Sequence, residues 1–416
     1  MALFLCADLG TTSLKAALID SGGRIHSHAR IPYRDPPVSA GPGPLAASSW
    51  LAAFAAALDS LVPPDDTPPS ALIISGGGPT LVPVDAAGES LRPLHWFEGP
   101  PPLEGAASLF LPKVKAFMEN APGEFAKTRL FFSPQEWLSW KLGAEPVTVL
   151  PHKGYEPYYW DGEQREKLGI RGDLFPPYVT MGAVIGELKF PAELAPAGHA
   201  RRAGFLPAGV PIVAGPPDFI AALIGTGALA PGRACDRTGS SEGINLCAAE
   251  RPALDPAEPA PGEPGRPRVL PHAVEGLWNL GMVIDRSGKL LDDYLAAAGL
   301  NRRPCGELIN EFLASPSHPG KKILETMGRS FCRALDDLAA WGFPAGELVL
   351  SGGQSRTPRW NQYKADISGR VLHAPEVADA ELAGNAVLGA AALEGGGVAE
   401  TAAKMIRVKE SYYPRP

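Results

Sequence analysis

The first part of the chain alternates short apolar runs with small polar turns. Residues 2–7 form one apolar run, a Gly-Thr-Thr turn follows, and residues 14–20 form a second run that ends at Ser21-Gly22-Gly23. Apolar runs of this length between turn residues are typical of buried strands. The pattern therefore predicts a β-hairpin with a polar tip, followed by another strand over residues 24–31.

The pattern next predicts a helix and another buried strand. Residues 50–61 are rich in alanine, and Ser48 or Ser49 precedes them as a candidate N-cap. Residues 71–75 form an apolar run that ends in three glycines. Strand, hairpin, helix and strand in this order predict an α/β sheet with its chemistry in the loops at strand ends.

Two features stand out in the middle of the chain. Ser133, Pro134 and Glu136 have the spacing of a capping box, which predicts a helix that runs to about Leu142. Residues 155–161 are rich in tyrosine, and two interpretations remain open. The rings line a pocket, or they hold a surface loop to the core, and the second interpretation is favoured because amphipathic rings are often half-buried.

The second half of the chain repeats the plan of the first half in weaker form. Residues 233–243 resemble the first hairpin and its tip, and residues 348–353 resemble the strand at 73–77. Because 416 residues exceed what one hydrophobic core usually organises, two domains are expected. We predict one domain over residues 1–225 and another over 226–416, with a cleft between them.

Composition and charge exclude several classes of protein. Apolar residues make up 45% and charged residues 20% of the chain, as in an ordinary globular protein. The net charge is −7 and no run of Lys or Arg is present, so we expect no nucleic-acid partner. The five cysteines are widely spread without a C-x-x-C pair, which predicts reduced thiols in the core. Without a signal-like segment or a long apolar run, we expect a cytoplasmic protein and no membrane partner.

The first hairpin tip carries residues suited to phosphate binding. Successive N–H groups of the small turn Gly10-Thr11-Thr12 can approach phosphate oxygens, and Lys15 can supply a positive charge. Asp8 ends the preceding strand, where its carboxylate can hold water ligands of Mg²⁺. The tip alone is equally compatible with a plain hairpin turn that Asp8 stabilises.

The second half offers matching elements. Gly239 and Ser240 lie in a loop of the same kind, so the two loops could hold a triphosphate between them. Gly352 and Gly353 follow a buried strand and allow the backbone to approach a flat ligand such as adenine, although an ordinary strand-to-helix turn has the same pattern.

A candidate general base lies between the halves. Residues 210–214 predict a buried strand, Gly215-Pro216-Pro217 form a stiff corner, and Asp218 begins an apolar helix. Asp218 can cap the helix, and it can accept a proton from a substrate hydroxyl during phosphoryl transfer. Both roles are compatible.

These segments resemble the FGGY carbohydrate kinases, which include xylulose, ribulose, gluconate and glycerol kinases. The resemblance rests on residues 8–16, 215–218, 238–241 and 351–390, and the last segment is the richest in matching positions. It implies two domains of the actin and ribonuclease H-like fold, with a central cleft where ATP and sugar meet. It also implies Asp218 as general base and a hydrated Mg²⁺ shared by Asp8 and Asp218. The residues that it implies for phosphate and ATP binding are Gly10, Thr11, Thr12, Lys15, Gly239, Ser240, Gly288, Gly352, Gly353 and Thr357.

The chain departs from the family pattern around the sugar. Gly78-Pro79-Thr80 stands where xylulose kinases carry Met-His-Gly, and Phe219 follows the candidate base where Asn or Gln is common. Trp96 begins a segment that keeps an acid but lacks the usual arginine, and His95 beside it is a further pocket candidate. Fewer hydroxyl partners should change substrate preference. The candidate substrate-binding residues are Gly78, Pro79, Thr80, Trp96, Asp218 and Phe219.

The leading hypothesis is ATP-dependent phosphorylation of a hydroxyl of a small sugar or polyol, with a ketopentose such as xylulose as the first expectation. The alternative is a catalytically silent, nucleotide-binding sugar sensor of the same fold. A third hypothesis, an actin- or chaperone-like ATPase, has less support because the C-terminal segment matches the sugar kinases. A homodimer is expected by analogy alone.

Overall fold

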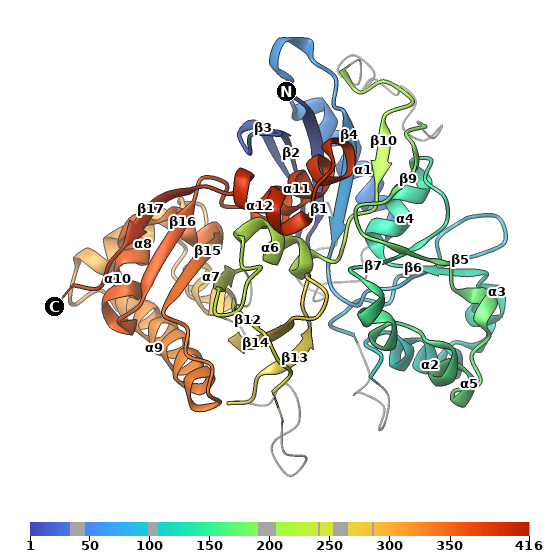
Figure 1. Ribbon diagram of the computed structural model, residues 1–416. Coiled ribbons are helices and arrows are strands. Elements are labelled where there is room, and N and C mark those ends of the chain that lie inside the picture. Colours follow the sequence, from blue (N-terminus) through green and yellow to red (C-terminus); the bar gives the residue numbers. More distant parts are fainter. Residues whose placement is uncertain are drawn as a thin grey trace. The chain divides into compact units, whose positions relative to one another are not determined.

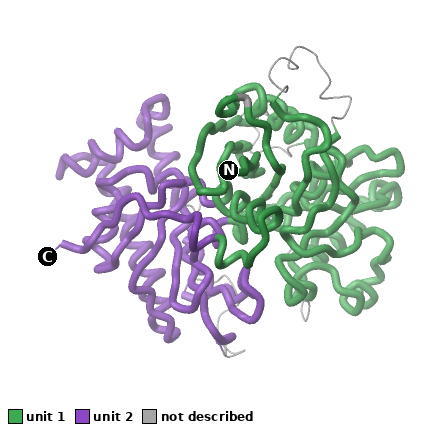
Figure 2. Tube along the Cα trace, turned by 45° about the horizontal axis from the view of Figure 1, so that its top comes forward, with its two compact units in different colours: residues 1–221, 381–401 green, residues 222–380, 402–416 purple. Residues whose placement is uncertain are grey.

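The computed structural model describes residues 1–33, 46–98, 107–189, 205–239, 242–252, 265–284 and 287–415. The chain forms two compact units, which Figure 2 colours separately. Unit 1 comprises residues 1–221 and 381–401, and unit 2 comprises residues 222–380 and 402–416. Each unit contains a central sheet with helices, so the predicted α/β class is confirmed.

The described sheet of unit 1 has the strand order β3-β2-β1-β4-β10-β9 (Figure 1). The first two strands form the predicted antiparallel hairpin, and β1 also pairs in parallel with β4. Every residue of β1 and β4 is buried, which explains their continuous apolar runs. The strands are β1 (Leu3–Leu9), β2 (Ser13–Asp20), β3 (Ile25–Pro32), β4 (Ala71–Gly76), β9 (Val184–Glu187) and β10 (Pro211–Val213).

Helix α11 (Ala380–Glu394) comes from the far end of the sequence, yet from Glu381 onward it belongs to unit 1. Two glycines allow its close approach. A Cβ at Gly384 would lie 1.9 Å from the Ala221 carbonyl oxygen, and a Cβ at Gly389 would lie 2.8 Å from the Phe4 ring. Because any side chain at Gly384 would clash with backbone, this helix can pack at its observed depth only with glycine there.

The other elements of unit 1 surround this sheet. The predicted capping box is confirmed, because the Ser133 and Glu136 side chains make the reciprocal bonds at the start of α4. The rings of Tyr155, Tyr159 and Trp160 are buried, in agreement with a segment held to the core. These elements are α1 (Ala47–Ser60), β5 (Val82–Val84), α2 (Leu111–Asn120), α3 (Pro122–Lys127), β6 (Leu130–Phe132), α4 (Pro134–Lys141), β7 (Thr148–Leu150), α5 (Gly162–Lys167), β8 (Tyr178–Thr180) and the start of α6 (Asp218–Thr226).

Unit 2 is built on the strand order β13-β14-β12-β11-β15-β16-β17 among its described residues. Strand β11 pairs antiparallel with β12 and parallel with β15, as β1 does with β2 and β4. The predicted repeat of the plan is therefore confirmed in the strand pairing. The strands are β11 (Ala234–Thr238), β12 (Glu242–Ala248), β13 (Arg268–Pro271), β14 (Trp278–Ile284), β15 (Glu347–Gly352), β16 (Val371–Pro375) and β17 (Val408–Tyr412).

The long helix α9 (Pro319–Ala340) packs against the sheet of unit 2 and forms much of its apolar core. Helix α9 contributes Phe331, Leu335 and Leu338 to the apolar cluster that β11, β12, β14 and β15 share. Regular spacing of these residues along α9 gives it one apolar face. The helices are α7 (Ser287–Ala297), α8 (Cys305–Ala314), α9 (Pro319–Ala340), α10 (Pro358–Ser368) and α12 (Val398–Met405), of which α12 begins in unit 1.

Some expectations need correction. Helix α1 begins at Ala47, so Ser48 and Ser49 lie inside its first turn, and its N-cap Ala46 makes no side-chain cap bond. Cys6, Cys235 and Cys247 are buried, but Cys305 is exposed and Cys332 is only partly buried. Predicting five core thiols was therefore wrong for Cys305, which is exposed at the start of α8, whereas Cys332 packs partly buried against the core of unit 2.

The compact units also differ from the predicted domains at 1–225 and 226–416. The first boundary falls after Ala221, and residues 381–401 return to unit 1. Within the described ranges, no single helix is long and apolar enough to cross a membrane, and α11 with α12 qualifies only as a bent pair by length and composition.

Candidate active site

Asp8 is held at the end of β1 by both of its neighbouring strands. The pairing register places it opposite Lys15 on β2 and beside Ser75 on β4. Its side chain is buried, and its Oδ1 accepts a hydrogen bond of 3.0 Å from the Ser75 hydroxyl. The carboxylate is therefore fixed by the sheet at the base of the Gly-Thr-Thr turn.

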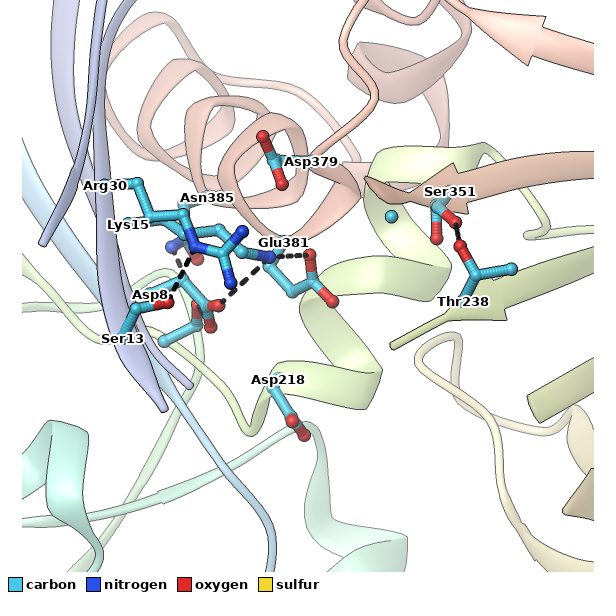
Figure 3. Close-up of polar contacts among 12 residues, drawn as sticks. Asp8, Ser13, Lys15, Arg30, Asp218, Thr238, Ser351, Asp379, Glu381 and Asn385 are labelled. Atoms are coloured by element: carbon cyan, nitrogen blue, oxygen red, sulfur yellow. Dashed lines mark hydrogen bonds and ion pairs between the residues drawn. The ribbon is translucent and has the colours of Figure 1, made fainter. Parts of the chain in front are cut away.

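Lys15 lies between two carboxylates of unit 1 (Figure 3). Its Nζ is 3.9 Å from Asp8 Oδ2 and 3.6 Å from Glu381 Oε2, and 21% of its side chain is exposed. Glu381 comes from the first turn of α11, so a residue late in the sequence completes this ion cluster. The sequence placed Glu381 within the family-like segment 351–390 but gave it no role.

Asp218 lies at the start of α6, where Pro216 and Pro217 bring the chain away from β10. Its Oδ1 accepts a 2.6 Å hydrogen bond from the Phe219 amide. A Cβ at Gly77 would lie 3.8 Å from Asp218 Oδ2, so this carboxylate reaches the glycines that follow β4. Asp218 is partly exposed.

The three carboxylates influence one another. The pKa of Asp8 is raised to about 8, chiefly by burial and also by the charges of Glu381 and Asp218, while Lys15 and Ser75 oppose the rise. Mutual repulsion of this kind favours a divalent cation nearby, and Mg²⁺ usually keeps several water ligands. Among the described residues, no three His, Cys, Asp or Glu side chains lie close enough together to hold a metal ion directly. The donor set suits an ion held through its water ligands.

Trp96 connects the predicted substrate residues to the first loop. Its amide donates to Thr80 Oγ1 at 3.1 Å, and its Nε1 donates to Thr11 Oγ1 at 3.3 Å. A Cβ at Gly78 would lie 3.0 Å from Trp96, and Gly78 has a φ of +56°, so glycine is required there. Trp96 is 45% exposed, so its ring is available to a ligand.

Four further side chains belong to this description. Pro79 and Phe219 are partly buried, and His95 is buried, which favours a core role for the imidazole. The buried Lys113 donates to the His95 carbonyl at 2.7 Å and lies within 3.3 Å of the Trp96 carbonyl oxygen. Sequence reasoning missed Lys113, because a lysine on an ordinary helix gives no sign of burial.

In unit 2, the ends of β11 and β15 lie side by side, and both precede residues that were predicted to contact the nucleotide. Thr238 pairs with Gly352, and its Oγ1 donates to the Ser351 carbonyl at 2.7 Å. Gly352 has a φ of +85°, and a Cβ there would lie 1.9 Å from the Thr238 carbonyl oxygen. A Cβ at Gly353 would meet nothing within 4 Å beyond its chain neighbours, so the backbone is open there. Gly239 follows Thr238 and is exposed, whereas Ser240 lies outside the described residues.

Gly288 and Thr357 occupy the first turns of helices in the same unit. Gly288 is buried in α7, and the preceding Ser287 donates to Glu242 Oε2 at 2.7 Å. Thr357 is the buried N-cap residue of α10, directly after the turn that Gly353 begins.

Unit 2 also contains a buried ion cluster that was not predicted. Lys364 on α10 donates to Asp236 on β11 and, at 2.6 Å, to Glu242 on β12. Burial and the charge of Glu242 outweigh the attraction of Lys364 and raise the pKa of Asp236. Burial opposes ionisation of Glu242 as well, but Lys364 and Ser287 outweigh it and lower the pKa. The one available signal was Lys364 one helical turn after the buried Trp360.

Comparison with known proteins gives three kinds of similarity. Residues 313–393 match the C-terminal domain of the FGGY family of carbohydrate kinases. The autoinducer-2 kinase of Salmonella paratyphi A is 24% identical over 366 residues, which cover 74% of this chain and 65% of that protein. The chain therefore spans less than two thirds of that relative's length.

Solved structures resemble the chain over its whole length. A ligand-bound xylulose kinase from Lactobacillus acidophilus has a TM-score of 0.77 at 14% identity, and the match covers 100% of this chain and 94% of that one. Plasmodium falciparum glycerol kinase with ADP has a TM-score of 0.76 at 14% identity, with the same coverage of both chains. These neighbours confirm the predicted actin and ribonuclease H-like fold. The resemblance to the FGGY family of carbohydrate kinases is thus confirmed, by its C-terminal domain over residues 313–393 and by the fold of the whole chain.

Proposed function

We propose that this chain is a carbohydrate kinase that transfers the γ-phosphoryl group of ATP to a hydroxyl of a small sugar or polyol. The observation that carries the proposal is the gathering of Asp8, Lys15 and Glu381 at the end of β1, with Asp218 near enough to raise the pKa of Asp8. Carboxylates, a lysine and a glycine-rich turn are the groups that phosphoryl transfer requires.

Each group has a distinct task in the proposed reaction. Asp218 accepts the proton of the acceptor hydroxyl as its oxygen attacks the γ-phosphorus, and the bond to the bridging oxygen breaks to release ADP. Lys15 and the amides of Thr11 and Thr12 stabilise negative charge on the transferred group. Asp8 and Asp218 would hold Mg²⁺ through its water ligands, and the ion would neutralise phosphate charge when bound. In unit 2, the open Gly353 and the tight turn at Gly352 suit the adenosine.

The acceptor site supports a small polyhydroxylated substrate. The Trp96 ring is exposed beside Thr11, and an aromatic face suits the apolar face of a sugar. Pro79 and Phe219 supply no side-chain hydrogen bond, so fewer hydroxyls are recognised by polar side chains. A ketopentose such as xylulose remains the first compound to test, together with the substrates after which the autoinducer-2 kinase, xylulose kinase and glycerol kinase relatives are named.

Replacement of the base tests the proposal. We expect Asp218→Asn to lower kcat by roughly 10²–10⁴-fold with the best acceptor, because the hydroxyl proton loses its acceptor. The measurement is ADP release over a panel of pentuloses, hexuloses, polyols and sugar acids, with ATP binding followed by titration calorimetry. Asp173→Asn is the matched control, because Asp173 is exposed at the surface, where it pairs with the exposed Arg171 at 3.3 Å. Full turnover by Asp218→Asn would refute the role of Asp218.

The sensor hypothesis is favoured by one observation, the loss of polar side chains at Pro79 and Phe219. The same panel separates it from the kinase. ADP release that one acceptor stimulates supports a kinase, whereas tight ATP binding without stimulation by any acceptor supports a sensor. Steady hydrolysis without an acceptor would support an ATPase.

A further inference from the structure

Helix α11 places a second polar side chain against the end of β1, one turn after Glu381. Asn385 is fully buried, and its Nδ2 donates to the Ala7 carbonyl at 2.8 Å and to Ser75 Oγ at 3.0 Å. Figure 3 shows Asn385 and Glu381 beside Asp8 and Lys15. All of these residues belong to unit 1.

The bonds form a directed chain that ends on Asp8. The Ser75 hydroxyl has one proton, which can go to Asp8 Oδ1 at 3.0 Å or to the Ala7 carbonyl at 3.4 Å. Asn385 donates to both Ser75 Oγ and the Ala7 carbonyl, so it competes with Ser75 for that carbonyl. This competition and the shorter distance favour donation of the serine proton to Asp8.

The backbone keeps Asn385 at the required depth. Gly384 precedes it, and a Cβ there would collide with the Ala221 carbonyl oxygen at 1.9 Å. Because the helix touches backbone at this point, the Asn385 amide group reaches Ala7 and Ser75 without an intervening layer of side chains. Glu381 on the same helix draws Lys15 to 3.6 Å, so α11 contacts both charged partners of the first loop.

We propose that Asn385 is a positioning residue for phosphoryl transfer, which acts through Ser75 to fix the orientation of the Asp8 carboxylate. The inference rests on the proposed kinase function and adds to it a residue from the C-terminal segment that serves the N-terminal loop. A purely structural Asn385 would stabilise the fold and leave the affinity for Mg²⁺ and nucleotide unchanged.

The test compares Ser75→Ala, Asn385→Leu and the double variant with the wild type. We expect each single variant to bind Mg²⁺·ADP about 3–10-fold more weakly in titration calorimetry, which corresponds to one lost hydrogen bond to a functional group. Binding of ADP without Mg²⁺ should stay unchanged. The double variant should be no weaker than the weaker single variant, because both substitutions break the same chain.

Controls keep this result interpretable. Thr148→Val removes another buried hydroxyl of unit 1, bonded to the Pro176 carbonyl, and should leave Mg²⁺·ADP binding unchanged. Ser75→Thr retains a hydroxyl and should restore most of the affinity lost in Ser75→Ala. A fall in Tm with unchanged Mg²⁺·ADP affinity, or effects of the two single variants that multiply, would overturn the inference. A wild type that binds Mg²⁺·ADP but phosphorylates no acceptor would instead refute the proposed function.

Discussion

The two units contain the same three kinds of charged residue, an aspartate, a lysine and a glutamate, in opposite environments. In unit 1, Lys15 is 21% exposed and lies 3.6–3.9 Å from Glu381 and Asp8. In unit 2, the side chain of Lys364 is 1% exposed, and its Nζ is 2.6 Å from Glu242. The first cluster is open enough to meet a ligand and the second is not, so we propose a functional role for the first and a stabilising role for the second.

The strand register explains the difference. Leu9 pairs with Gly76 and Thr238 pairs with Gly352, so Asp8 corresponds to Arg237, and Asp236 corresponds to Ala7. Successive residues of a strand point to opposite faces, and the acids of the two units therefore lie on different faces of equivalent strands. A shift of one position separates the carboxylate proposed to hold Mg²⁺ from a buried ion cluster.

The largest expected effect on stability is at Lys364. Lys364→Met leaves two buried acids without their cation and should lower the free energy of unfolding by about 3–5 kcal/mol. Lys15→Met should lower it by less than about 1 kcal/mol, because a partly exposed pair contributes little. Urea unfolding of both variants measures the contrast. Equal losses would show that the two clusters do not differ as their burial indicates.

Catalytic activity, unlike stability, should depend strongly on Lys15. Lys15→Met removes a positive charge from the proposed phosphate site, and we expect kcat/KM to fall by roughly 10²-fold. Lys15→Arg should retain part of the activity, because it keeps the charge but changes the geometry. Steady-state kinetics with the best acceptor measures both variants. A Lys15→Met enzyme with wild-type kcat/KM would remove Lys15 from the proposed mechanism.

A pH-dependent effect concerns the proton on Asp236. Its pKa is about 8 in the folded protein and near 3.8 when unfolded, because burial and Glu242 favour the neutral acid. The folded state therefore holds this proton more tightly, and stability decreases as pH rises from about 4 to about 8, by at most about 1.4 kcal/mol per pH unit. Asp236→Asn should remove this part of the slope in urea unfolding between pH 5 and pH 8. Parallel curves for the variant and the wild type would show that Asp236 is ionised throughout.

Local patterns in the sequence predicted the local structure. The first hairpin, the capping box of α4 and the repeated strand pairing follow from alternation, turn residues and cap spacing. The start of α1 was misplaced because Ser48 and Ser49 resemble caps, although the helix continues before them. Such signals depend only on neighbours along the chain.

Contacts between residues far apart in the sequence could not be predicted from such local patterns. Asn385 bonds to Ala7, and Lys364 bonds to Asp236, across more than a hundred residues in each case. A buried polar residue on a helix has the same sequence pattern whether its partner is a backbone carbonyl or an acid. Asp8, Lys15 and Asp218 were identified as site candidates because motif spacing marks them. No motif marks Asn385 or Lys364.

The return of α11 to unit 1 has a consequence for how the chain is made. Residues 1–221 leave the ribosome long before residues 381–401, which cover the Phe4 and Ile73 side chains through Gly389. Unit 1 cannot finish folding during its own synthesis, and it waits with apolar surface uncovered while unit 2 is translated. Premature termination before α11 would therefore leave the N-terminal half without the helix that completes it.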